Sequence, residues 1–249
     1  MEITPEVLLD IPLRPVDLLA DYQAVREQLD FYRQQRGRFC YIQTNGIFEC
    51  LNGPFGIENH LLYLALYPEE LKAVYRRQAE WNSRFIENMI ELGVDMIHIS
   101  DDWGAQNSLL FSQAMLAELI VPYHQMMSVP VKKAGKFLSL HSDGNINQGL
   151  DQILSIGYDV VHPWQETAGM SYAAYLEKYR DKFAIFGGLC IQSTLGFGDY
   201  ERLEREIRRV FGLLKGRRWI FCTTHFVQDH CSFAELEFAY DLAARLARQ

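Results

Sequence analysis

Six short apolar runs, separated mostly by helical patterns, constrain the fold of this chain more than any other feature. They lie near residues 39, 96, 137, 160, 183 and 219. Apolar runs of this length, bounded by turn residues, are typical of strands that are buried on both faces. Because strands that alternate with helices form βα units around a parallel sheet, the sequence predicts an α/β fold.

An internal repeat supports this prediction. Residues 93–99, GVDMIHI, resemble residues 157–163, GYDVVHP. Each segment has a glycine after a predicted helix, then an aspartate in the turn, and then an apolar strand that carries a histidine. Such a junction is expected to recur where βα units repeat. Chance similarity between two common helix-to-strand loops stays open as the alternative.

A complete TIM-type barrel has eight strands, two more than the apolar runs predict. Residues 1–36 hold a proline-interrupted apolar opening and then a helical pattern over 24–33. Either this lead-in supplies two degraded strands, or the barrel is open, or a partner completes it. No Gly/Ser-rich linker divides the chain, and 249 residues suit one sizeable core. We therefore expect 1–249 to form a single domain, a TIM-type (β/α) barrel that is incomplete at the N-terminus, with 1–36 as an irregular or helical lead-in.

Composition predicts which partners the protein can bind and where in the cell it works. The net charge of −8 argues against non-specific binding to nucleic acid or to an anionic membrane, since both need a basic surface. Five cysteines without a C-x-x-C pair argue against a disulfide framework. No stretch approaches the roughly 20 apolar residues of a membrane span, and the first residues do not resemble a signal peptide. We expect a cytoplasmic protein and, because an incomplete barrel exposes strand edges, a homodimer or larger homo-oligomer.

Polar side chains gather where the predicted strands end. The segment 140–145, LHSDGN, places His141 and Asp143 near the carboxyl end of one strand, which is where α/β folds hold their chemistry. Residues i and i+2 of an extended segment point to the same side, so the imidazole and the carboxylate can converge on one ligand or metal. The alternative is that Asp143 makes a turn with the next glycine, and that His141 is a hydrogen-bonded core histidine.

Taken in order, the strand-end segments resemble the uroporphyrinogen decarboxylase-like superfamily, in particular the branch that includes corrinoid-dependent methyltransferases. The segments that carry the resemblance are 101–106 (DDWGAQ), 141–145 (HSDGN), 157–165, 186–188 (FGG) with Gln192, and 224–225 (TH). The resemblance covers about residues 39–240. It implies a TIM-type barrel in which these loops line one pocket.

The resemblance also implies a metal site. Family members of the methylcobalamin:coenzyme M type hold zinc with a His-x-Cys pair at one strand end and a further cysteine near the last strand. His141 matches the first ligand, Asp143 stands at the position of the first cysteine, and His225 lies in the third region, close to Cys222. A His141, Asp143 and His225 set can hold Zn²⁺ or another divalent metal, although it is harder than a thiolate set.

The implied activity is methyl transfer between a small methylated or methoxylated substrate and a corrinoid that a partner protein carries. Asp101 and Asp102 are then expected to be catalytic, as proton acceptors or as partners of the metal ligands, the alternatives being a loop cap and a solvent-facing carboxylate. Four further residues are expected to bind the substrate: Trp103, Gln106, Asn145 and Gln165.

Two other functions stay open. One is a shortened, non-catalytic paralogue that binds a small molecule or a partner through the surviving pocket. The other is decarboxylation of a tetrapyrrole. The decarboxylases of the family rely on an early arginine-rich segment and on an aspartate of the second strand, for which Arg14 and Arg26 are weak replacements. The sequence therefore favours methyl transfer over decarboxylation.

Overall fold

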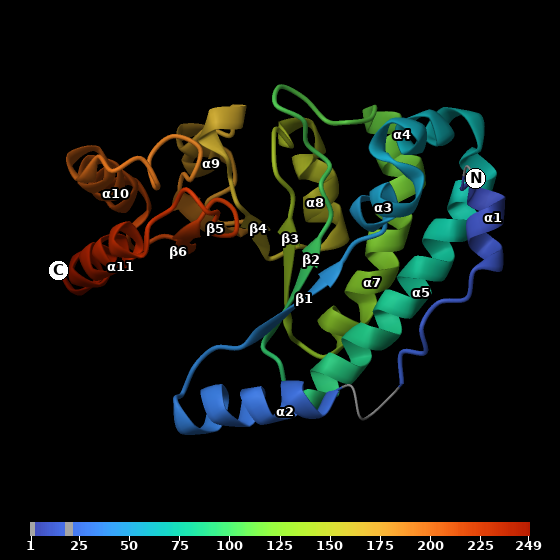
Figure 1. Ribbon diagram of the computed structural model, residues 1–249, viewed down its shortest axis with the longest axis horizontal. Coiled ribbons are helices and arrows are strands. Elements are labelled where there is room, and N and C mark those ends of the chain that lie inside the picture. The colour runs from blue at the N-terminus through green and yellow to red at the C-terminus, as the bar shows by residue number, and fades with distance from the viewer. Residues whose placement is uncertain (1–2, 18–21) are drawn as a thin grey trace.

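The chain folds around one sheet of six parallel strands, whose spatial order follows the sequence (Figure 1). The structure is a computed structural model and describes residues 3–17 and 22–249. Its strands are β1 (Tyr41–Asn45), β2 (Met96–Ser100), β3 (Phe137–His141), β4 (Val160–His162), β5 (Ala184–Leu189) and β6 (Trp219–Thr223). All five neighbouring pairs are parallel. Each strand lies at one of the six apolar runs, which confirms the predicted α/β fold.

Helices connect the strands and pack along the sheet. They are α3 (Asn52–Phe55), α4 (Ile57–Leu66), α5 (Pro68–Leu92), α6 (Gln113–Met115), α7 (Val121–Lys133), α8 (Leu150–Ile156), α9 (Tyr172–Lys178), α10 (Tyr200–Leu214) and α11 (Phe233–Arg248). The lead-in holds α1 (Pro5–Asp10) and α2 (Gln23–Leu29), and α2 continues into a π-helical segment, Asp30–Gln35. Across the residues that the structure describes, no helix has the length and hydropathy needed to cross a membrane.

The longest helix, α5, shows how the sequence pattern produces these elements. Pro68 stands at its first turn, where a missing N–H costs nothing. Its buried side chains recur at spacings of three and four and form one apolar stripe against the sheet and α7: Leu71, Val74, Tyr75, Ile86 and Met89. Gly93 ends the helix with a φ of +102°, a left-handed conformation that glycine adopts without strain.

The C-terminal part of the chain adds a second apolar cluster between the end of β5, α10 and α11. Helix α10 begins at Asp199, whose side chain accepts a hydrogen bond from the N–H of Arg202. Apolar residues at spacings of three and four form the buried stripe of α10: Leu203, Ile207, Val210, Phe211 and Leu214. These helices lie beside β5 and β6, far along the sheet from α5 and α7 (Figure 1).

The sheet is strongly rolled. The rings of Tyr41 on β1 and Phe186 on β5 lie 5.8 Å apart, although four strand spacings of about 4.8 Å separate these strands along the sheet. Contact across the interior is possible only if the sheet curves as part of a barrel. Strands β1 and β6 end the strand order, and the described part of the lead-in adds helices but no strand. The fold is therefore TIM-type, with its sheet open between β1 and β6 over the described residues.

Candidate metal centre

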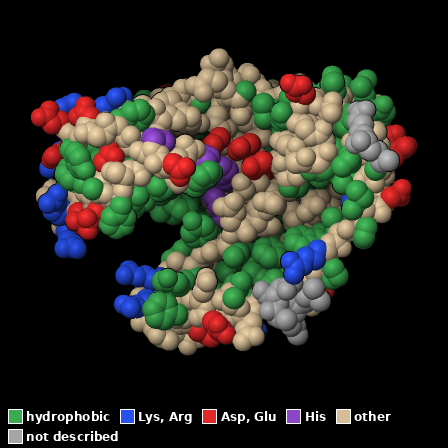
Figure 2. Space-filling model, viewed as in Figure 1, with side chains coloured by type: hydrophobic (Ala, Val, Ile, Leu, Met, Phe, Trp, Pro, Cys, Tyr) green, Lys and Arg blue, Asp and Glu red, His purple; other side chains and the backbone are tan. Residues whose placement is uncertain are grey.

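A cavity of about 470 Å³ lies on the concave side of the sheet, toward the carboxyl ends of the strands. Neighbouring strands β2, β3 and β4 each contribute a histidine to its wall, and the loops that follow β1, β2 and β6 contribute Glu49, Asp102 and His225. Figure 2 shows histidine and acidic side chains side by side where this face of the molecule is hollowed. Rolling of the sheet thus gathers polar groups that are up to about 175 residues apart in the chain into one site.

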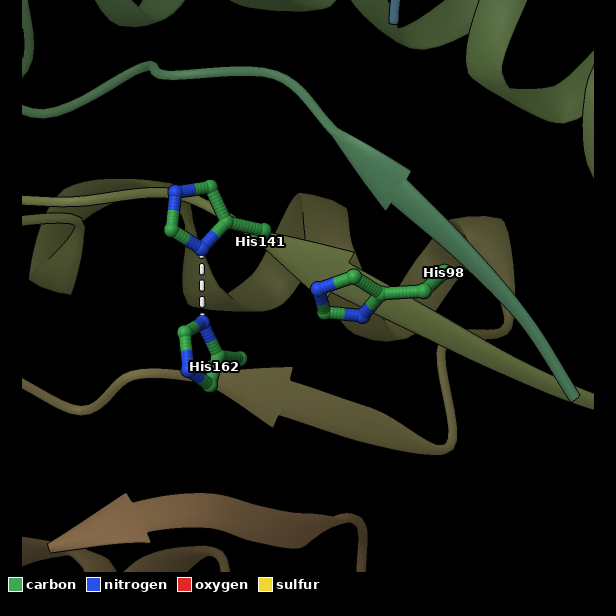
Figure 3. Close-up of side chains that lie close together, drawn as sticks. All are labelled: His98, His141 and His162. Carbon is green, nitrogen blue, oxygen red and sulfur yellow. Dashed lines mark hydrogen bonds between the residues drawn. The ribbon is translucent and has the colours of Figure 1, made fainter. Parts of the chain in front are cut away.

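The three strand histidines, His98, His141 and His162, form a cluster (Figure 3). Strand register explains it, because His141 pairs directly with His162, and His98 pairs with Ser139 two residues before His141. The Nδ1 atoms of His141 and His162 are 2.6 Å apart, and Nδ1 of His98 lies 2.8 Å from the Ser139 hydroxyl. Nε2 of His162 lies 3.3 Å from the carbonyl oxygen of Thr223.

These contacts assign the proton positions on two of the rings. A carbonyl oxygen can only accept, so the Thr223 contact places a hydrogen on Nε2 of His162 and leaves its Nδ1 as an acceptor. Nδ1 of His141 must then donate to Nδ1 of His162. Nε2 of His141 consequently carries a lone pair, and it faces the carboxylates of Asp102 and Asp143. A histidine whose second nitrogen is tied down in this way is oriented as metal ligands usually are.

Two carboxylates and a further imidazole surround that lone pair. Asp102 Oδ1 and Asp143 Oδ1 lie 3.6 and 3.9 Å from Nε2 of His141, and Asp143 Oδ2 lies 3.7 Å from Nε2 of His225. Asp143 Oδ1 is buried and has no hydrogen-bond partner among the described residues. A buried carboxylate oxygen without a donor is unfavourable, and a bound cation satisfies it. Oxygen and imidazole ligands of this kind fit Zn²⁺ or another divalent metal.

The electrostatics of the site also favour a cation. Burial, reinforced by the Asp102 carboxylate, raises the pKa of Asp143 to about 6 against the opposing effect of His225. Burial also raises the pKa values of Asp102 and Glu49. Burial lowers the pKa of His141 to about 4, so this ring is neutral at pH 7. Three clustered carboxyl groups and a neutral imidazole therefore meet here, and no lysine or arginine is among the described residues of the cavity wall.

The histidine cluster itself is a second possible metal-binding group, because one nitrogen of each ring lies within 4.8 Å of the others. Two nitrogens bound to one tetrahedral zinc at about 2.05 Å would be roughly 3.3 Å apart. The His141 and His162 nitrogens are 2.6 Å apart, which is a hydrogen bond and leaves no room for an ion between them. The group formed by Asp102, His141 and Asp143, with His225 beside it, is therefore the better candidate.

Asp101 lies on the other side of the strand from Asp102 and does not reach this cavity. Its side chain is fully buried among the loops and helices outside the sheet. It accepts hydrogen bonds from the N–H groups of Phe48 and Glu49 and from the Trp103 indole, and it pairs with Nε2 of His124 at 2.7 Å. Asp101 is expected to be catalytic, but the structure places its side chain outside the cavity. The reason is that residues i and i+1 of an extended segment point to opposite faces.

The four residues expected to bind substrate also lie away from the cavity wall. The Trp103 ring is fully buried, and Gln106 donates from its side chain to the carbonyl of Thr167. The side-chain oxygen of Asn145 accepts from the N–H of Asn147, and that of Gln165 accepts from the N–H of Gly144. The contacts of Gln106 and Gln165 fasten the strand-end loops to one another beside the candidate metal centre.

The structure adds three residues that the motif-based reasoning did not select: His98, His162 and Glu49. The internal repeat contained a signal for the two histidines, because it placed a histidine at the same position of two strands. Glu49 carries no such signal. It reaches the site from the turn after β1, where its carboxylate accepts a hydrogen bond from Ser100.

Comparison with known proteins agrees with this architecture. The family model of uroporphyrinogen decarboxylase (URO-D) matches residues 52–246. No curated protein matches the chain.

Two solved structures illustrate the shared fold. A methyltransferase from Methanosarcina mazei superimposes with a TM-score of 0.74 at 16% identity, over 93% of this chain and 67% of that one. A B12-independent methionine synthase from a Shewanella species, in complex with selenomethionine, gives a TM-score of 0.60 at 12% identity, over 90% of this chain and 65% of that one. The chain thus spans about two thirds of the length of each. With a family match over most of its length and the rolled parallel sheet that the resemblance implied, the chain belongs to the uroporphyrinogen decarboxylase (URO-D) family.

Proposed function

We propose that this protein is a metal-dependent methyltransferase that moves a methyl group between a small methylated or methoxylated substrate and a corrinoid carried by a partner protein. The observation that carries the proposal is the buried, unpartnered Asp143 Oδ1, which lies 3.9 Å from Nε2 of His141. The fold that the chain shares with the two methyl-transferring structures supports the reaction class.

In this proposal His141, Asp143 and His225 hold the metal, and Asp102 completes the group. A bound divalent metal lowers the pKa of a coordinated nucleophile and orients it. Asp102 lies next to His141, and its Oδ1 accepts the N–H of Asp143 at 2.7 Å. Its second carboxylate oxygen would be the proton acceptor for such a nucleophile. Asp101 supports the loop from outside the sheet and takes no part in proton transfer.

The cavity also suits a flat, apolar partner group at its opening. Phe226 follows His225 directly, lines the same cavity and is 72% exposed. Tyr240 of α11 and Tyr41 of β1 add two partly exposed rings to the same wall. Such aromatic surface can cover the face of a corrin and keep water from the reacting methyl group.

The charge of the cavity wall disfavours the decarboxylase alternative. The carboxylates of a tetrapyrrole need cationic partners, whereas the described wall carries the carboxyl groups of Glu49 and Asp102 and contains no lysine or arginine. The non-catalytic alternative predicts binding without methyl transfer, and the second experiment below distinguishes the two.

The first experiment measures metal by elemental analysis after purification and again after incubation with zinc. We expect about one metal ion per chain in the unaltered protein, and loss of the metal in His141→Ala and Asp143→Ala variants whose circular dichroism is unchanged. His230→Ala is the matched control, because His230 is exposed and lies outside the group. Absence of metal at any occupancy, or full retention by His141→Ala, would remove the metal centre.

The second experiment follows the absorbance of methylcobalamin in the presence of the metal-loaded protein and small thiol or hydroxyl acceptors. Metal-dependent demethylation that is lost in His141→Ala supports methyl transfer. A protein that binds metal at this group and leaves methylcobalamin unchanged with every acceptor would instead favour a non-catalytic binding protein.

A further inference from the structure

A second cavity, of about 550 Å³, lies between helix α10 and the loops that follow β4 and β5. It shares no lining residue with the cavity of the metal centre. A volume in this range is typical of sites for small organic molecules. We infer that this cavity binds a small oxyanion ligand, either a phosphate ester or a polycarboxylate, through Arg202 and Arg205 of α10 and the hydroxyl groups that face them.

Helix α10 supplies the positive charge. Arg202, Arg205 and Arg209 recur at spacings of three and four, so they form one row along the helix, and all three line the cavity. The sequence alone would assign the alternating charges of this helix to a solvated face. In the structure these arginines are exposed, and one row of them borders the cavity.

The three arginines differ in how far their charges are compensated. Arg209 is held in ion pairs with Glu166 and Glu206 and lies over the ring of Tyr172. Arg205 has one long contact of 3.6 Å, to Glu201, whose side chain is 91% exposed. The guanidinium of Arg202 makes no ion pair within the part of the chain that the structure describes. Two arginines thus retain donors for a ligand, in a protein whose net charge is −8.

The rest of the wall combines hydroxyl groups with two carboxylates, those of Glu166 and Glu206, which are both paired with Arg209. The loops after β4 and β5 contribute hydroxyl groups from Thr167, Ser193 and Thr194. Trp164 forms part of the wall, and the buried N–H of its indole has no acceptor among the described residues. An indole N–H can only donate, and guanidinium groups have no acceptor either. A ligand that fits this wall must therefore bring acceptor oxygens, and planar or tetrahedral oxyanions match arginine best.

The site does not depend on the proposed methyl transfer, since its lining residues differ from those of the first cavity. The test titrates the ¹⁵N-labelled, full-length protein with inorganic phosphate and, separately, with malonate, and follows the indole N–H signals of its four tryptophans. The Trp164→Phe variant assigns the signal of Trp164. Sodium chloride at matched ionic strength is the control for non-specific effects.

We expect a saturable shift of the Trp164 signal with at least one of the two anions, and the stronger of the two identifies the ligand class as phosphate or carboxylate. Arg202→Gln should weaken that binding roughly tenfold or more, because it removes a charged donor. Arg208→Gln should leave it unchanged, since Arg208 lies on the same helix, pairs with Glu204 and is not part of the cavity wall. Shifts equal to those with chloride, or equal weakening by both variants, would overturn the inference. Metal content should be the same in both variants.

Discussion

Two adjacent aspartates, Asp101 and Asp102, show how much a single residue step matters in this protein. Asp102 faces the cavity beside His141, whereas Asp101 is buried on the opposite side with four donors around it. Burial by itself raises the pKa of Asp101, but the hydrogen bond and charge of His124, with the backbone and indole donors, outweigh it and leave the pKa below its usual value. The ionised form of Asp101 therefore stabilises the fold.

Replacing this carboxylate tests its structural role. Asp101→Asn should lower the free energy of unfolding by roughly 2–5 kcal/mol, because the amide nitrogen would face the donors of Trp103 or His124. Asp102→Asn is the matched control, and we expect it to change stability by less than about 1 kcal/mol, since Asp102 is partly exposed. Urea unfolding followed by circular dichroism measures both. Equal stability of the Asp101 variant and the unaltered protein would contradict a structural role.

At the scale of elements, the caps and glycines place the loops. The sequence predicts a capping box at the start of α11, and the structure contains it: the Ser232 side chain accepts from the N–H of Glu235, and its hydroxyl donates to the Glu235 carboxylate. Glu235 does more than cap the helix. Its other oxygen accepts the N–H groups of Gly196 and Gly198, and so ties the loop after β5 to α11.

A comparable close contact joins the loops after β2 and β3. Gly144 has a φ of +77°, and a Cβ atom there would lie 2.6 Å from the carbonyl oxygen of Ala105. Glycine lets these two backbones approach, and it is this approach that sets Asp143 beside Asp102.

Glu235 yields a prediction about pH. Burial acts to raise its pKa, but the N–H groups of Gly198 and Gly196 and the Ser232 hydroxyl lower it overall. A lowered folded-state pKa means that the carboxylate contributes stability above the unfolded pKa of about 4.3, and that this contribution is lost as the pH falls through the folded-state pKa. Glu235→Gln should therefore destabilise the protein by about 1–2 kcal/mol at pH 7 and by progressively less on acidification below pH 4.

Thermal unfolding of both proteins between pH 7 and pH 3 measures this dependence. Glu237→Gln, on the exposed side of the same helix, serves as the control and should have little effect at any pH. A stability difference for Glu235→Gln that stays constant over the whole range would show that its charge contributes nothing.

At the scale of the whole molecule, the open side of the sheet is where apolar side chains and strand edges are exposed. Large apolar side chains that are 40–54% exposed lie at its two edges and at the amino ends of its strands: Phe39, Tyr41, Phe137 and Ile220. The outer backbone groups of β1 and β6 have no neighbouring strand within the described residues. Proteins usually cover such edges, so we expect a homo-oligomer to bury the open side of the sheet.

Light scattering tests that expectation. The unaltered chain should have a mass at least twice 28.9 kDa, and Phe39→Glu should shift it toward 28.9 kDa by placing a charge in the covered face. Val129→Glu is the control, since Val129 is 61% exposed on α7 and lies away from the opening. A monodisperse monomer of the unaltered protein would contradict the prediction.

The sequence by itself determined the secondary elements, the fold class and the place of the pocket. Apolar runs, helical stripes and caps are local signals, because periodicity and capping depend on residues only a few positions apart. The order of strand-end motifs also identified the superfamily. These motifs also select His141, Asp102 and His225, and the structure places all three on one cavity wall.

The tertiary structure alone decided which polar residues meet. Asp101 and Asp102 are equivalent in a motif, and only the packing of the sheet settles which of them faces inward, since one residue step reverses the side. His98 and His162 join His141 through register between strands, and Glu49 arrives from a loop after β1. The side chains of Gln106 and Gln165 and the backbone N–H of Trp103 fasten loops because those loops fold onto one another. Such contacts join residues far apart in the chain, and they exist only once the rolled sheet brings its strand ends together.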